Sequence, residues 1–126
     1  MLEGLRAVRA VRHRTANALQ AAYGWAQLGD EERTRLSLER LVREEALLSA
    51  LSRSGREAEQ FRLWQLLADA EQAGRRIAFW GEAANVRPGM LTALLPQLAQ
   101  ALAEGGPGGL RITCGDAGVM LFSSEE

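Results

Sequence analysis

The sequence predicts an α+β protein in which an N-terminal antiparallel helical hairpin is followed by a small α/β unit. The first half of the chain has no proline and is rich in alanine, leucine, arginine and glutamate, a composition that favours helix. The second half combines amphipathic helical segments with short alternating stretches that are bounded by glycine. We therefore expect two parts, a helical hairpin over residues 1–55 and an α/β unit over residues 56–126.

The first part reads as two long helices joined by a short turn. Residues 3–28 keep a helical period, Gly29 is expected to end that helix, and Asp30 is expected to cap the next one. The second helix is predicted from about residue 31 to 52, before Ser54-Gly55. Apolar residues at helical spacing are expected to face inward: Val8, Val11, Ala18, Leu19, Ala22 and Trp25 on the first helix, and Leu36, Leu41, Val42, Leu48 and Leu51 on the second.

A single hairpin of this kind buries too little apolar surface to be stable alone. A second copy or another helix pair must therefore cover its apolar side. Dimerisation into a four-helix bundle is the simplest arrangement, and we expect a homodimer.

The second part is predicted to hold two helices and about three strands. Residues 58–73 form an amphipathic helix with Phe61, Trp64, Leu67 and Ala68 inward, and residues 76–82 have strand character. A fourth helix is expected over residues 90–104, with Pro88 at its start and Pro96 kinking or splitting it. Gly105–Gly109 reads as a connector before a β-hairpin, in which residues 110–114 and 119–122 flank a glycine-containing turn.

Composition excludes several classes of protein. The chain has 126 residues, 47% of them hydrophobic and 25% charged, and a net charge of −1, so we expect no nucleic-acid partner. No apolar run approaches the roughly 20 residues of a membrane span, and no membrane partner is expected. The single cysteine, Cys114, permits no internal disulfide, which favours a cytoplasmic location. One histidine and one cysteine make no zinc or iron site.

The most informative polar residues lie on the first predicted helix. Arg9, His13, Asn17 and Gln20 form a stripe almost opposite its apolar side, and His13 is the only histidine of the chain. An exposed imidazole is nucleophilic near neutral pH, and arginine side chains suit phosphate oxygens. The stripe thus matches the needs of phosphoryl transfer between histidine and aspartate, although an ordinary surface histidine has the same spacing.

Residues 11–48 resemble the sporulation initiation phosphotransferase B family and the related helical hairpins of sensor kinases. The shared pattern is an Arg-His pair, an asparagine four residues on, a Leu-Gln pair, and glycines near the helix end. In this sequence the pattern is carried by Arg12, His13, Asn17, Leu19, Gln20, Gly24 and Gly29. The order of segments that follows is similar to a shortened histidine-kinase ATPase fold.

The resemblance implies a dimeric four-helix bundle that presents one histidine per protomer to response-regulator receiver domains. His13 would accept a phosphoryl group from one regulator's aspartate and pass it to another's, with Asn17 orienting the reacting groups. Phosphate or an acidic partner would be contacted by Arg9, Arg12, Arg14 and Gln20. No cofactor is expected on this chain, because the magnesium ion would belong to the regulator.

Two departures from the family's pattern argue against an ATP-dependent kinase. Arg14 stands where the family usually has an acidic residue that accepts the imidazole proton. A working nucleotide site of the ATPase fold uses an asparagine near the position of Gln100, and Gly105–Gly109 lacks phosphate-loop spacing. The alternative function is therefore a non-catalytic dimeric adaptor, a degenerate sensor kinase that binds a regulator or sensor without moving phosphate.

Overall fold

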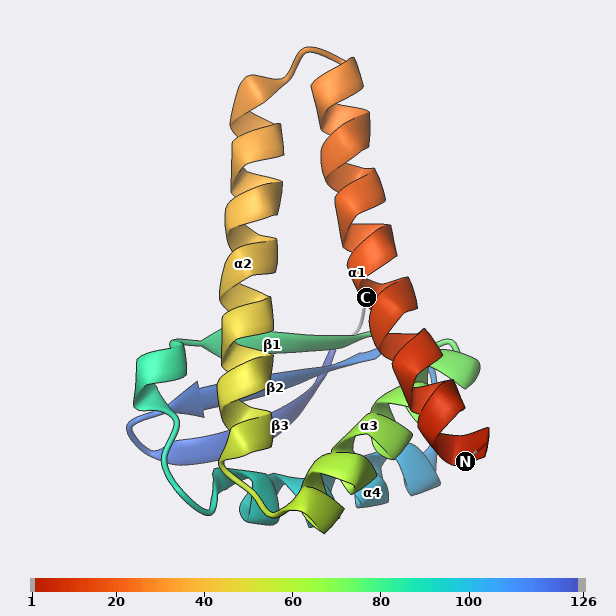
Figure 1. Ribbon diagram of the computed structural model, residues 1–126, viewed down its shortest axis with the longest axis vertical. Helices are drawn as coiled ribbons and strands as arrows, with labels where there is room; N and C mark the ends of the chain where they lie inside the picture. Colours follow the sequence, from red (N-terminus) through yellow and green to blue (C-terminus); the bar gives the residue numbers. More distant parts are fainter. Residues whose placement is uncertain (1, 125–126) are drawn as a thin grey trace.

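The computed structural model describes the backbone of residues 2–124 and the side chains of residues 14–123. It is an α+β fold with four α-helices, one short 3-10 helix and three strands over this part of the chain (Figure 1). The elements in order are α1 (Leu2–Gln27), α2 (Glu31–Arg53), α3 (Glu57–Gln72), β1 (Ile77–Gly81), η1 (Ala83–Asn85), α4 (Met90–Glu104), β2 (Gly109–Gly115) and β3 (Gly118–Ser124).

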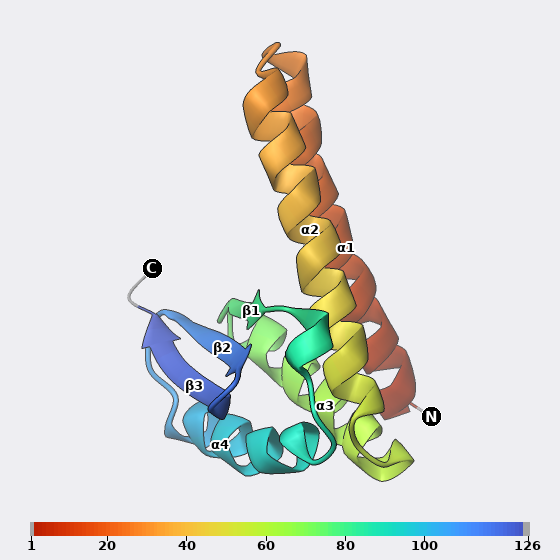
Figure 2. The same cartoon turned by 90° about the vertical axis from the view of Figure 1, so that its left-hand side faces the viewer.

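Helices α1 and α2 form the predicted antiparallel hairpin, whose turn end projects beyond the rest of the molecule (Figures 1 and 2). The turn is built as the sequence predicts. Gly29 adopts a φ of 75°, a conformation that favours glycine, and Asp30 caps α2. The Asp30 carboxylate accepts a hydrogen bond of 2.9 Å from the backbone N–H of Arg33.

The three strands form one mixed sheet in the order β1-β2-β3. Strands β1 and β2 run parallel, with Ile77 opposite Leu110, and α4 makes the connection between them. Strands β2 and β3 form the predicted hairpin, with Cys114 opposite Val119. Because β1 pairs only with β2, its other edge is open to side chains from the helical hairpin.

One hydrophobic core joins the base of the hairpin to the second half of the chain. Its buried residues come from the last turns of α2, from α3 and α4, and from one face of the sheet. Largest among the fully buried side chains are Leu47, Leu48, Leu51, Leu63, Leu91, Leu94, Leu98, Leu110 and Ile112. Helices α3 and α4 pack on that face of the sheet, while the hairpin rises beside β1 (Figure 2).

Several apolar residues expected to face inward are exposed instead. Leu19 on α1, Leu36 and Val42 on α2, and Phe61 on α3 all have large exposed fractions, and Val42 reaches 68%. Toward their turn, α1 and α2 extend past the rest of the molecule (Figure 1), so a single partner helix cannot cover every apolar side chain of the hairpin. Phe61 lies on the outer side of α3, away from the buried Leu63, Leu66 and Leu67.

Pro96 does not split the helix, because α4 runs continuously from Met90 to Glu104. Proline removes one helical hydrogen bond, the bond to the carbonyl of Thr92. Both Pro96 and Thr92 are exposed, so water can satisfy that carbonyl. At the start of this helix Gly89 is the N-cap, so Pro88 precedes the cap rather than taking the first helical position.

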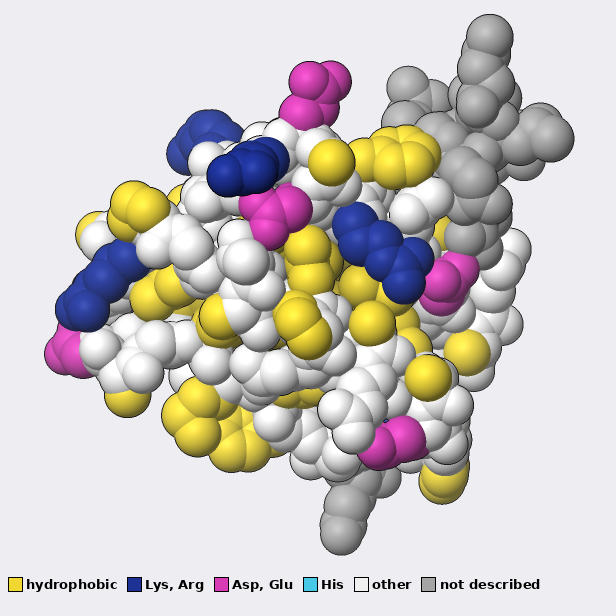
Figure 3. Space-filling view, turned by 90° about the horizontal axis from the view of Figure 1, so that it is seen from below, with side chains coloured by type: hydrophobic (Ala, Val, Ile, Leu, Met, Phe, Trp, Pro, Cys, Tyr) yellow, Lys and Arg dark blue, Asp and Glu magenta, His cyan; other side chains and the backbone are white. Residues whose placement is uncertain are grey.

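The end of the molecule opposite the hairpin turn mixes hydrophobic side chains with charges of both signs (Figure 3). None of the helices in the described residues has both the length and the apolar character needed to cross a membrane.

Candidate functional site

The predicted site residues all lie on α1, and the structure describes the side chains of only some of them. Arg9, Arg12 and His13 fall within the helix, but their side chains lie outside the described residues. Asn17 and Gln20, one turn and two turns after position 13, are exposed. Asn17 and Gln20 are therefore exposed, as the helical spacing predicts.

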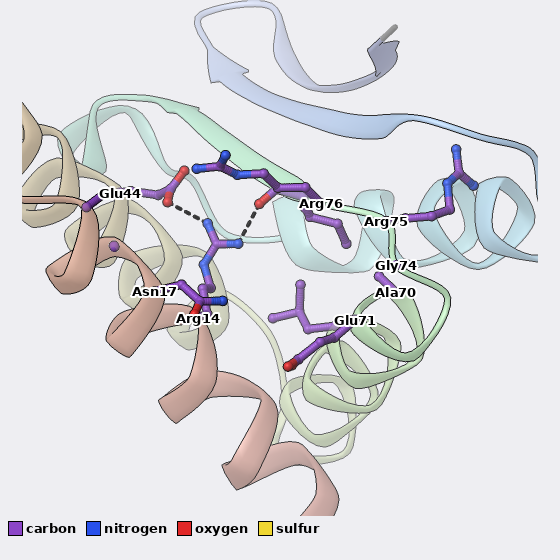
Figure 4. Close-up of a pocket in the computed structure, with 12 residues that line it drawn as sticks. Arg14, Asn17, Glu44, Ala70, Glu71, Gly74, Arg75 and Arg76 are labelled. Atoms are coloured by element: carbon purple, nitrogen blue, oxygen red, sulfur yellow. Dashed lines mark hydrogen bonds and ion pairs between the residues drawn. The ribbon is translucent and has the colours of Figure 1, made fainter. Parts of the chain in front are cut away.

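Arg14 points from α1 toward the open edge of β1 rather than outward (Figure 4). Its guanidinium forms an ion pair of 2.6 Å with the carboxylate of Glu44 on α2 and donates a hydrogen bond to the backbone carbonyl of Ile77. It also lies over the Phe79 ring, 5.2 Å from the ring centre. The side chains of Arg14 and Glu44 are only 21% and 17% exposed, so water screens this pair weakly.

Glu44 completes a link between the hairpin and the sheet. Its second carboxylate oxygen accepts a hydrogen bond of 2.9 Å from the backbone N–H of Phe79. The Arg14–Glu44 pair therefore bonds to a carbonyl and an N–H two residues apart on β1, as one residue of a neighbouring strand would. An edge that would otherwise be unpaired is occupied by side chains from α1 and α2.

A cavity of about 430 Å³ lies beside this link, between α1, the end of α3 and the start of β1 (Figure 4). Small apolar side chains line part of its wall, among them Ala18, Ala21 and Ala70. Asn17 and Arg76 approach it from opposite sides, from α1 and from the residue before β1. The cavity thus connects the exposed side of α1 with the beginning of the sheet.

A second feature of the hairpin is a set of exposed apolar side chains on the side away from the sheet. Tyr23 on α1 follows Ala21 by two residues, and Val42 on α2 precedes Glu44 by two; Ala21 and Glu44 line the cavity on the sheet side. Two helical residues turn the side-chain direction by about 200°. Tyr23 and Val42 therefore point away from the sheet, and Leu19 and Leu38 lie one turn from them on the same sides.

The glycine-rich segment before β2 is held by a buried arginine. The Arg75 guanidinium donates hydrogen bonds to the carbonyls of Ala101, Gly105 and Gly108, at 3.1 to 3.3 Å. Gly105, Gly106 and Gly108 have positive φ angles. The segment therefore turns carbonyl oxygens toward a cation of the protein itself.

The described residues offer few other reactive groups. No cluster of three or more histidine, cysteine, aspartate or glutamate side chains among them is arranged to hold a metal ion. Cys114 is buried on the core face of β2, and burial raises the pKa of its thiol. A thiol in this state is a poor nucleophile.

Sequence reasoning missed the Arg14–Glu44 link and the outer face of the sheet. The link joins residues far apart in the sequence, and no local pattern marks it. The outer face could have been predicted from the alternation in β1, β2 and β3, which places Trp80, Arg111 and Phe122 opposite the core residues.

Comparisons of the chain with protein-family models, with curated proteins and with solved structures find no match.

Proposed function

We propose that this protein is a histidine phosphotransferase of a phosphorelay, which passes a phosphoryl group between the aspartates of response-regulator receiver domains through His13. The protein would act as a homodimer whose two hairpins form a four-helix bundle. The observation that carries the proposal is the exposed apolar side of the hairpin, with Tyr23 65% and Val42 68% exposed on the face turned away from the sheet.

That apolar side is what a bundle of two hairpins requires. Leu19 and Tyr23 on α1, and Leu38 and Val42 on α2, are each four residues apart, so each pair forms a stripe along its helix. Stripes of this spacing pack well against the same stripes of a second copy. Burying them would leave Asn17, which lies about 120° round α1 from Tyr23, outside the interface.

The proposed chemistry uses the imidazole of His13 as a nucleophile. One unprotonated ring nitrogen would attack the phosphorus of an aspartyl phosphate, forming an N–P bond while the acyl P–O bond breaks and the carboxylate leaves with the electron pair. A second receiver's aspartate would reverse the step, breaking the N–P bond. Asn17, one turn along the helix, would orient the reacting groups, and Arg9 and Arg12 would contact the phosphate or an acidic partner. Magnesium would be held by the receiver.

The position of Arg14 supports transfer between proteins rather than self-phosphorylation from ATP. Its guanidinium is engaged by Glu44 and by the carbonyl of Ile77, and arginine does not act as a base in any case. Transfer from an acyl phosphate depends mainly on positioning and charge neutralisation, so it does not need an acidic residue at this position.

The proposal is tested by incubating the protein with each receiver domain of its organism, phosphorylated beforehand on aspartate. We expect acid-labile, alkali-stable labelling of the wild-type chain and none of His13→Ala. Gln97→Ala, at an exposed position on α4, keeps the imidazole and every proposed contact; it is the matched control and should still be labelled. Absence of labelling by every receiver would end the proposal.

The alternative is a non-catalytic dimeric adaptor that binds a regulator or sensor. It is favoured by the engagement of Arg14 in a structural link at the residue directly after His13. An adaptor would keep its cellular activity in His13→Ala and lose it when the dimer is disrupted, whereas a phosphotransferase would lose activity in both variants.

A further inference from the structure

The outer face of the sheet is exposed and built from side chains that are common at protein interfaces. Alternation along the three strands places Ile77, Phe79, Leu110 and Ile112 in the core and directs the intervening side chains outward. These outward residues form two rows across the strands: Ala78, Arg111 and Phe122, then Trp80, Thr113 and Met120. In the described part of the chain no helix covers this face (Figures 1 and 2).

Aromatic rings and arginines are stacked on this face. The guanidinium of Arg111 lies 5.8 Å from the centre of the Trp80 ring and 5.3 Å from that of Phe122. Arg40, on the neighbouring α2, lies 5.7 Å from the Trp80 ring. Distances below about 6 Å are those of cation–π contacts, which hold the arginines in place while their N–H groups stay available. Trp80 is 51% exposed, an unusual state for so large a ring without a partner.

The arginines of this face give it a positive charge. Among residues 14–123, no ion pair joins Arg40, Arg76 or Arg111 to an acidic side chain. Arg76 precedes Ala78 by two residues, and it shares the cavity of Figure 4 with Asn17. The positive surface therefore extends from the sheet toward the exposed side of α1.

We propose that this face, defined by Trp80, Arg111, Phe122, Arg40 and Arg76, is a docking surface for the acidic face of a receiver domain. That the partner is a receiver domain rests on the function proposed above. That the surface suits an acidic protein partner follows from its own side chains. Tryptophan, arginine, phenylalanine and methionine are enriched at interfaces. The three guanidinium groups, which join no ion pair within residues 14–123, are complementary to carboxylates. A receiver bound at the polar side of α1 would be held by this second contact.

A protein partner fits this surface better than a single-stranded nucleic acid does. Base stacking needs free ring faces along an electrostatic groove. Here Arg111 and Arg40 already lie over the rings, and the whole chain carries a net charge of −1. Guanidinium groups held in place over rings instead present fixed forks to carboxylates.

The test compares receiver binding by the full-length protein and by the double variant Trp80→Ala/Arg111→Glu. Both residues point outward, so folding should be preserved, which circular dichroism and the melting temperature will check. Arg62→Glu, a charge reversal at an exposed position on α3, is the matched control. Equilibrium binding of the organism's receiver domains is measured by fluorescence anisotropy, separately from phosphoryl transfer.

We expect the double variant to bind the receiver at least about tenfold more weakly than the wild type and the control, with weaker binding of the wild type at high salt. In phosphoryl transfer this should raise KM more than it lowers kcat. If the double variant binds as well as the wild type, the proposed docking surface is wrong, even if labelling of His13 succeeds. If the wild type binds a receiver but is not labelled, only the proposed phosphotransferase activity is wrong. A wild-type chain that binds no receiver, or that binds a labelled oligo-dT through the same residues, also overturns the surface.

Discussion

Arg14 and Glu44 form an ion pair of 2.6 Å that ties both helices of the hairpin to the backbone of β1. The pair joins three elements at once, since Arg14 comes from α1, Glu44 from α2, and their backbone partners from the edge strand. Through it the segment that carries position 13 has a fixed place relative to the sheet.

Replacing Arg14 should destabilise the protein. Arg14→Met leaves the carboxylate of Glu44 without its cation and the carbonyl of Ile77 without its donor, in a setting where both side chains are mostly buried. We expect a loss of about 2 kcal/mol in the free energy of unfolding, measured by urea denaturation. Arg35→Met is the matched control: it removes the exposed contacts to Glu32 and Glu39 and should have much less effect. Equal losses in the two variants would show that the link adds nothing.

The exposed apolar stripes predict the association state. Light scattering should give about twice the chain mass of 13.7 kDa for the wild type. Val42→Glu places a charge in the proposed interface and should return the mass to that of one chain, because an unpaired carboxylate there opposes burial. Leu36→Glu is the control, since Leu36 is 49% exposed but lies about 120° round α2 from Val42. A monomeric wild type, or a dimer unaffected by Val42→Glu, would contradict the bundle.

Replacing Gly81 and replacing Gly24 by alanine should change the free energy of unfolding in opposite directions. Gly81 ends β1 with a φ of 129°, and a Cβ there would collide with the carbonyl oxygen of Cys114 on β2. Gly81→Ala should lower the free energy of unfolding by roughly 1–3 kcal/mol. Gly24 lies inside α1 with open space around it, so Gly24→Ala should raise that energy by roughly 0.5–1 kcal/mol. Thermal unfolding followed by circular dichroism measures both; a neutral Gly81→Ala would mean that β1 and β2 can separate at this point.

Glu59 should account for part of the loss of stability of the fold at low pH. Its carboxylate accepts hydrogen bonds from the backbone N–H of Arg56 and from the Thr92 hydroxyl, and these lower its pKa. A lowered pKa stabilises the fold fully above the pKa of the unfolded chain, about 4.3, and this stabilisation is lost as the pH falls through the lower folded value. Glu59→Gln should therefore flatten the fall in melting temperature below about pH 5. Glu57→Gln, at the same end of α3, removes an equal charge and should keep the wild-type fall.

Most of the fold was predictable because local sequence signals mark the ends of its helices and strands. Gly29 and Asp30 mark the hairpin turn, Gly74 follows the third helix, and alternation marks the strands. What the sequence could not show was where the second half of the chain packs against the hairpin. Leu48 and Val42 both fit the apolar spacing of α2, yet Leu48 is buried in the core and Val42 is 68% exposed on the side away from the sheet. Periodicity identifies an apolar side but not what covers it.

The candidate site was predictable in the same partial way. Helical spacing correctly indicates that Asn17 and Gln20 are exposed. Arg14 has the same residue type as its predicted companions, but its contacts lie 30 and 63 residues away in the chain, and tertiary packing alone turns it toward β1. The roles of His13, Arg9 and Arg12 stay predictions, to be decided by the labelling experiment.

The hold of Arg75 on the carbonyls of Gly105 and Gly108 accounts for the glycine content of that segment without any ligand. The carbonyl oxygens of these residues accept from a cation of the protein itself, whereas an anion cradle is built from converging backbone N–H donors. Gly105, Gly106 and Gly108 have positive φ angles, which favour glycine, so the path of the backbone around Arg75 explains the run of glycines.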